Sequence, residues 1–252
     1  MKPYQFYTVG RFPKLAVGAS VKNQVQMTFS GEGEDVETSL TLKDRTYEGT
    51  LALVRVKSEV KYETFGFIKK VVGNERRKID FTEYLQPVDF PAYHDEGKNI
   101  LIFQAPKKVC RGVLSNLRSN PCGVELVEMV VDFAKVMDLC SEYQGAWFRG
   151  VSSRVRAAGL SGDQIQHDGL FKKLLKDGEL SNVTIPWMLE NVEHRVMITS
   201  TGAIILVQDY RSNQGLELQI VVDVFDKLLS KVWAEKRGRR RSEEIDIPVE
   251  PE

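Results

Sequence analysis

A run of alternating residues from Thr50 to Val72 is the strongest constraint on the fold of this chain. β-Branched and aromatic side chains recur there at every second position, which is the periodicity of a β-strand. The pattern is interrupted at Gly66 and stops at Gly73. The run therefore predicts one long strand or a hairpin, within a first third of the chain that is rich in strands.

Two other segments have the residue spacing of amphipathic helices. In residues 106–121, apolar positions follow a helical stripe, with one proline suited to the first turn and another that ends the helix. Residues 216–237 carry one apolar stripe and predict the longest helix, although their β-branched start also allows an edge strand. A shorter helix is expected between Asp163, as a start signal, and Gly178, as a stop.

The order of these elements predicts an α+β fold of mixed, mainly antiparallel sheets with a few helices. In the second half, the order strand, strand, helix, hairpin, helix fits a ferredoxin-like arrangement. The hairpin is expected across residues 200–202. Residues 124–137 can be read as strand or helix, and the polar, glycine-bearing residues 29–39 predict a loop.

The length of 252 residues allows one large domain or two small ones. The Asn-Pro-Cys-Gly sequence at residues 120–123 is the best candidate boundary. We therefore predict a strand-rich α+β domain at 1–120 and a second α+β domain at 121–236 that ends in an amphipathic helix. The charged residues 237–252 are predicted to form a disordered tail.

The composition is that of an ordinary globular protein in the cytoplasm. The chain is neutral, with 35 basic and 35 acidic residues, so any strong electrostatic field has to come from local clustering. Its three cysteines include no pair with CxxC spacing, which argues against a disulfide framework or a cysteine zinc site. No apolar run is long enough for a signal peptide or a membrane helix, so we expect no membrane partner.

Sequence motifs for catalysis and cofactor binding are absent, and we expect no cofactor and no metal. Neither a phosphate-binding glycine loop nor a GxSxG or HExxH motif occurs. Adjacent His and Asp residues at His94 and His167 could face one cation, but only His194 remains as a third histidine. We expect His194 in the core and the other two at the surface.

One enzyme hypothesis has a specific set of residues. A magnesium-dependent nuclease needs an acid upstream of a strand that carries an acid and a lysine two residues apart. Asp44, Glu59 and Lys61 match that order. Such triplets are also expected by chance on a solvated strand, and this hypothesis ranks last.

Basic residues are clustered along the chain even though the total charge cancels. Residues 106–120 hold four basic residues and no acid, and residues 147–158 hold three arginines and no acid. Residues 43–78 hold ten basic residues and five acids. Cationic side chains bind phosphates, and arginines beside an exposed aromatic ring can stack on unpaired bases. Alternation in a strand would place Phe148 on the same face as Arg154 and Arg156.

The sequence thus predicts a non-catalytic protein that binds DNA or RNA. The expected contacts are Lys107, Lys108, Arg111, Arg118, Phe148, Arg154, Arg156, Lys236, Arg237, Arg239, Arg240 and Arg241. The basic tail residues 236–241 could equally complement a helix C-terminus, and the acids that follow could cancel them.

The alternative is a protein-interaction or assembly subunit that binds itself or another protein. In that case the arginines would pair with the acidic residues 123–143, within one chain or between chains.

Overall fold

The computed structural model describes residues 2–29, 32–72, 75–119, 123–210 and 212–235. The strands are β1 (Tyr4–Arg11), β2 (Ser20–Phe29), β3 (Glu32–Tyr47), β4 (Leu51–Val72), β5 (Glu75–Asp95), β6 (Ile100–Gln104), β7 (Glu125–Val131), β8 (Gly145–Arg149), β9 (Ala157–Ser161), β10 (Glu179–Leu189), β11 (Val192–Thr199), β12 (Ile204–Leu206) and β13 (Trp233–Glu235). The helices are α1 (Lys107–Ser119), α2 (Phe133–Leu139), α3 (Gly169–Asp177), α4 (Gln214–Val224) and α5 (Ser230–Val232), with a π-helical segment (Phe225–Leu229) between α4 and α5 and a 3₁₀ turn (Ile165–His167) before α3.

An antiparallel sheet runs through both halves of the chain, in the order β2-β3-β4-β5-β6-β1-β12-β11-β10-β8-β9. Strand β1 joins the halves, because Tyr4 pairs with Gln104 on one side and with Ile204 on the other. The predicted α+β class with mainly antiparallel strands is confirmed. The ferredoxin-like arrangement is not confirmed, because β7 pairs with β1 and β13 rather than with β8 or β10.

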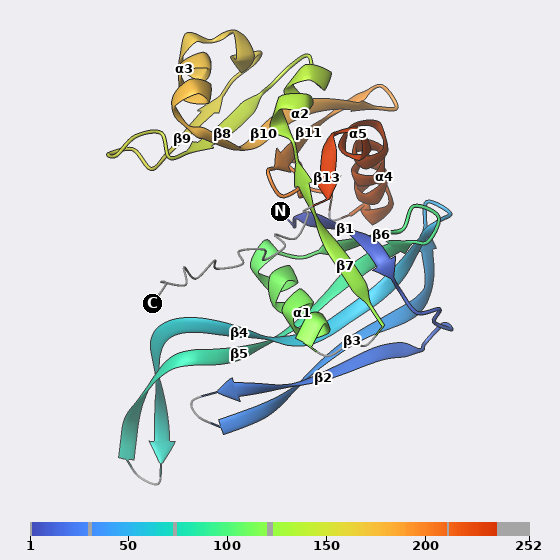
Figure 1. Cartoon of the computed structure of the whole chain (residues 1–252), viewed down its shortest axis with the longest axis vertical. Coiled ribbons are helices and arrows are strands. Elements are labelled where there is room, and N and C mark those ends of the chain that lie inside the picture. The colour runs from blue at the N-terminus through green and yellow to red at the C-terminus, as the bar shows by residue number, and fades with distance from the viewer. Residues whose placement is uncertain (1, 30–31, 73–74, 120–122, 211, 236–252) are drawn as a thin grey trace, which may run out of the picture.

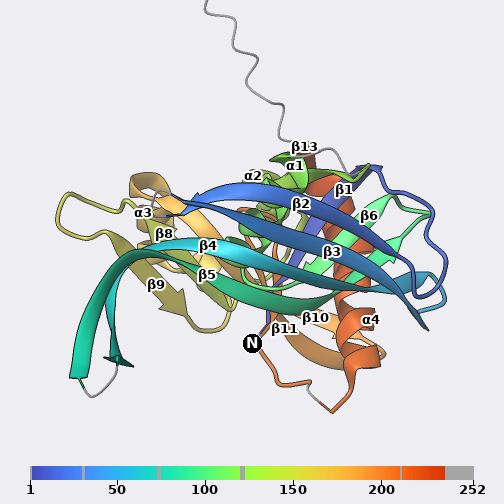
Figure 2. The ribbon, with the colours of Figure 1, turned by 90° about the horizontal axis from the view of Figure 1, so that it is seen from below.

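The alternating run beginning at Thr50 forms β4, and its partner β5 completes a hairpin that extends far beyond the body (Figures 1 and 2). The hairpin is bent along its length (Figure 1), and its register shifts between Glu63 and Gly66, an irregularity of the kind that bends a strand. Gly66 leaves room for the ring of Phe81, since a Cβ atom there would lie 2.6 Å from its Cζ. Of the two predicted alternatives for this run, one long strand is therefore confirmed.

The loop predicted at residues 29–39 is wrong, because this segment contributes to strands β2 and β3, which pair from Phe29 and Glu32 onward. Val36, Thr38 and Leu40 alternate into the core and are fully buried. Burial of one strand face outweighs the polar composition of the other face.

Two apolar clusters pack on opposite faces of the sheet, since Ile100 and Ile102 of β6 belong to one and Leu101 and Phe103 to the other. In the first half, α1 packs on β2, β3 and β4, so closely that a Cβ on Gly112 would lie 2.3 Å from a methyl of Val60. The second cluster crosses the predicted boundary at residue 120, for example where Phe6 stacks on Phe225 at 5.0 Å. The division into two domains remains a prediction, and the two segments share a sheet and a core.

The predicted helices are present, but some of them begin or end at residues other than those predicted. Helix α1 lies where the apolar stripe predicts it. Helix α3 begins after Asp168, whose side chain accepts from the amide of Leu170, and not after Asp163. The long C-terminal helix is interrupted, and its predicted last turns are wrong because Trp233 pairs with Val131 of β7. Within the described residues, no helix combines the length and apolar character needed to cross a membrane.

Candidate nucleic-acid interface

The predicted contacts on α1 are largely engaged within the molecule. Arg111 Nε lies 3.6 Å from Glu128 Oε1, and Arg118 Nη2 donates to the carbonyl of Leu126 at 3.0 Å. The ammonium of Lys108 lies 4.2 Å from the centre of the Tyr62 ring. Lys107 also has an interaction partner. These side chains tie α1 to its neighbouring strands, so this helix is a weaker candidate for phosphate binding than its charge suggests.

Phe148 does not form the stacking surface that the sequence predicts. Its ring is fully buried and packs edge-on against Phe171 of α3, with centroids 5.7 Å apart. Strand β8 ends at Arg149, and Gly150 turns the chain with a positive φ of 62°. The alternation therefore does not continue to Arg154, and the predicted shared face is wrong.

Trp147 takes the exposed position beside Phe148. Its side chain is 47% exposed on the sheet face opposite α3. It pairs in register with Gly159 of β9, and a Cβ atom at Gly159 would lie 2.4 Å from the six-membered ring. The indole therefore lies against bare backbone on one side. Because aromatic residues this exposed offer a surface to unpaired bases, Trp147 is a better stacking candidate than Phe148.

The turn that follows β8 carries two further arginines. The amide of Gly150 donates to the carbonyl of Arg156 at 2.8 Å, and the amide of Val155 donates to Ser152 Oγ at 2.9 Å. Arg154 and Arg156 are exposed in this turn, and Arg149 is exposed at the end of β8. These bonds order the backbone, so the arginines are presented without the cost of ordering a loose loop.

Among the described residues, neither Arg149, Arg154 nor Arg156 forms an ion pair. The cross-strand neighbour of Arg149 is Glu179, with which it makes no salt bridge within the described structure. We call Trp147, the three arginines and Gly159 the Trp147 face.

The distal part of the β4–β5 hairpin, residues 64–72 and 75–82, is a second exposed surface, here called the arm. Phe65 is 77% exposed, and three further apolar side chains, those of Phe67, Ile68 and Val71, are more than half exposed. Lys78 lies over the Phe67 ring at 4.8 Å. The arm and the turn between β8 and β9 project toward the same side of the molecule (Figures 1 and 2).

The residues of the nuclease hypothesis do not converge. Because Leu42 pairs with Val54 and Thr46 with Ala52, Asp44 lies about six strand residues from Glu59, or roughly 20 Å at about 3.3 Å per residue. Lys61 is held by Glu83, with 2.7 Å between Nζ and Oε1. Within the described residues, no three His, Cys, Asp or Glu side chains are grouped to hold a metal ion.

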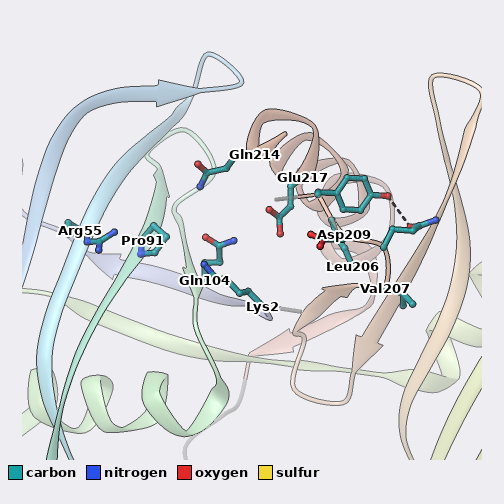
Figure 3. Close-up of a pocket in the computed structure, with 11 residues that line it drawn as sticks. Lys2, Arg55, Pro91, Gln104, Leu206, Val207, Asp209, Gln214 and Glu217 are labelled. Carbon is teal, nitrogen blue, oxygen red and sulfur yellow. Dashed lines mark hydrogen bonds between the residues drawn. The ribbon is translucent and has the colours of Figure 1, made fainter. Parts of the chain in front are cut away.

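A polar pocket of about 740 Å³ lies between the two halves of the sheet (Figure 3). It is lined by Lys2, Arg55, Pro91, Gln104, Leu206, Val207, Gln208, Asp209, Tyr210, Gln214 and Glu217. Two cations and two acids line it, and Arg55 is already paired with Asp89. This balance favours no particular ligand charge.

A directional chain of hydrogen bonds runs behind this pocket. Tyr47 donates a hydrogen bond to Gln214 at 3.1 Å, and Gln214 donates one to Tyr93 at 2.6 Å. Tyr93 in turn donates to Gln104 at 3.3 Å, and Gln104 donates to Tyr4 at 2.6 Å. Tyr4 is hydrogen-bonded to Glu217 at the end of the series. Burial, and then the charge of Glu217, raises the pKa of Tyr4, so its phenol remains a donor. We interpret this series of hydrogen bonds as a polar link between α4 and the strands of the first half of the protein.

The histidines are placed partly as predicted. His194 is buried and hydrogen-bonded to Tyr210, as expected for a core residue. His167 is exposed, whereas His94 is half-buried against the ring of Phe12, 4.5 Å away. The prediction of a surface position for His94 is therefore wrong, since strands β4 and β6 flank it. The predicted contacts from Lys236 to Arg241 lie outside the described residues.

Comparison with known proteins gives no family assignment. No protein-family model matches the chain, and no curated protein is significantly similar to it in sequence.

Proposed function

We propose that this protein binds single-stranded nucleic acid on the Trp147 face, without catalysis. The observation that carries the proposal is an exposed indole, seated on Gly159, with Arg149 on the same strand face and two further exposed arginines in the turn that follows, none of them in an ion pair in the described structure. Trp147 would stack on a base, and Arg149, Arg154 and Arg156 would contact phosphates. Stacking of this kind contributes about 1–3 kcal/mol per base.

The neutral net charge is compatible with this proposal, because only the local field acts on a bound strand. DNA and RNA both provide unpaired bases and phosphates, and the proposal covers both. A cytoplasmic location remains a prediction from the thiol content of the chain.

Fluorescence anisotropy with a labelled DNA or RNA oligonucleotide tests the proposal. Three phosphate contacts on a single strand would give a slope of about −2 in log affinity against log salt. We expect Trp147→Ala to lower the affinity by about tenfold or more, in line with the stacking energy above. Removing Arg154 and Arg156 together should flatten the salt dependence.

A matched control comes from the opposite side of the sheet. Lys172 and Lys173 are exposed on α3, the helix that covers the Phe148 side. Replacing both by Ala removes as much charge as the double arginine change. Equal losses in the two double variants would refute a localised site, as would a wild-type protein that retains no oligonucleotide at low salt.

A protein-interaction subunit is the second candidate function. The observation in its favour is the exposed apolar surface of the arm, since contiguous surfaces of this kind mark binding sites for other molecules. Sedimentation at several concentrations tests self-association. A change in mass that Phe67→Ser abolishes would support this candidate over the first.

A further inference from the structure

Apolar side chains remain exposed on both faces of the arm. Phe67 and Val71 are an even number of residues apart in β4 and therefore point to one face, whereas Ile68 points to the other. All three are more than half exposed. A two-stranded ribbon without packing is marginally stable in water. The arm thus has the properties of a surface that is completed by another molecule.

The charge of the arm indicates what kind of molecule that is. Across the arm, from Thr64 to Thr82, the sequence holds five basic residues and two acids. The ladder pairs Lys69 with Lys78, which also forms an ion pair with Asp80 at 2.9 Å. Like charges directly opposite one another destabilise a hairpin. A polyanion would offset this repulsion and complement the net positive charge of the arm.

Duplex nucleic acid also fits the dimensions of the arm. Two paired strands lie about 4.8 Å apart, and a major groove about 12 Å wide admits a two-stranded ribbon. From Thr64 to Val72 the strand extends for roughly 30 Å, close to one turn of a double helix. Exposed apolar side chains such as Phe67 can contact thymine methyl groups or base edges there.

We infer that the arm binds in a groove of double-stranded nucleic acid, so that the ligand is a duplex with a single-stranded extension. Lys69 and Lys78 contact its phosphates from the ribbon. The Trp147 face, which projects toward the same side, receives the unpaired strand (Figures 1 and 2). The single-stranded part of this inference rests on the proposed function, whereas the duplex part rests on the arm alone.

Anisotropy of the full chain with three labelled DNAs tests the inference: a single strand, a blunt duplex and the same duplex with a single-stranded overhang. Lys69→Gln with Lys78→Gln removes two phosphate contacts and should weaken duplex binding by about tenfold, with single-strand binding unchanged. Trp147→Ala should do the reverse. The overhang substrate should bind more tightly than either simple ligand.

Two controls keep the outcomes distinct. Circular dichroism verifies that each variant is folded, and Lys172→Gln with Lys173→Gln on α3 tests for a mere loss of total charge. Vesicles of phosphatidylcholine with phosphatidylglycerol test a membrane as the polyanion. Arm-dependent binding to these vesicles with no duplex binding would overturn the inference.

Each result decides between the two proposals. Duplex binding that the arm variant does not weaken, or no duplex binding at low salt, overturns the arm inference and leaves the single-strand proposal standing. Arm-dependent duplex binding without any single-strand binding supports the arm and refutes the proposed function. Loss of both activities in the α3 control would overturn both.

Discussion

The six-membered ring of Trp147 lies directly against Gly159, the residue opposite it on β9. No side chain could replace the glycine hydrogen without moving the ring, because a Cβ atom would lie 2.4 Å from Cε3 and from Cζ3. The exposed position of the indole thus depends on a residue in a different strand.

The first prediction is that Gly159→Ala disturbs the Trp147 face. The methyl group should push the indole away from the sheet and weaken single-strand binding toward the level of Trp147→Ala. A shift in tryptophan emission would report the displaced ring. Gly169→Ala is the matched control, because a Cβ atom there meets open space. If Gly159→Ala binds the single strand as tightly as the wild type does, binding does not depend on the contact between the Trp147 ring and Gly159.

The second prediction concerns the contact between α1 and β4. Gly112→Ala should destabilise the fold by about 1–3 kcal/mol, because the added methyl collides with Val60. At an exposed helical position the same change would stabilise by about 1 kcal/mol through helix propensity. Urea unfolding distinguishes the two signs. Ser115→Ala, at an exposed position of the same helix, should leave the midpoint almost unchanged.

The third prediction addresses the hydrogen-bond chain at the pocket. Tyr93→Phe removes a hydroxyl that accepts from Gln214 and donates to Gln104. Leaving buried polar groups without partners costs about 1–3 kcal/mol per group, so the free energy of unfolding should fall by at least that amount. Tyr84→Phe, at a half-buried position where the described structure shows no hydrogen bond to the hydroxyl, should change it by only a few tenths of a kcal/mol. Equal midpoints in urea for both variants would contradict the linking role.

The fourth prediction is a pH dependence set by His94. Burial lowers the pKa of His94 below its ordinary value of 6.5, although Glu96 and Asp95 partly oppose that shift. The unfolded chain therefore binds a proton more readily, and stability should be complete above pH 6.5 and decrease as the pH falls toward the lower, folded pKa. His94→Gln should flatten this part of the stability curve. His167→Gln, at an exposed position, should leave it unchanged, and a parallel curve for His94→Gln would contradict the assignment.

The local periodicity of the sequence was sufficient to predict the position of elements that bury one regular face. The β4 alternation and the α1 stripe each repeat over many residues, and both elements lie where the sequence predicts them. The buried position of His194 follows from the same alternation in β11. These features depend on neighbours along the chain, which a single sequence contains.

Tertiary structure decided which face each residue of the candidate site presents. Trp147 and Phe148 are adjacent in sequence, and only the position of α3 determines which of them is buried. The seat on Gly159 and the end of β8 at Gly150 likewise depend on pairing between strands. Residues brought together by folding are distant in sequence, and a shift of one residue in a strand exchanges its two faces, so local pattern by itself could not make that choice.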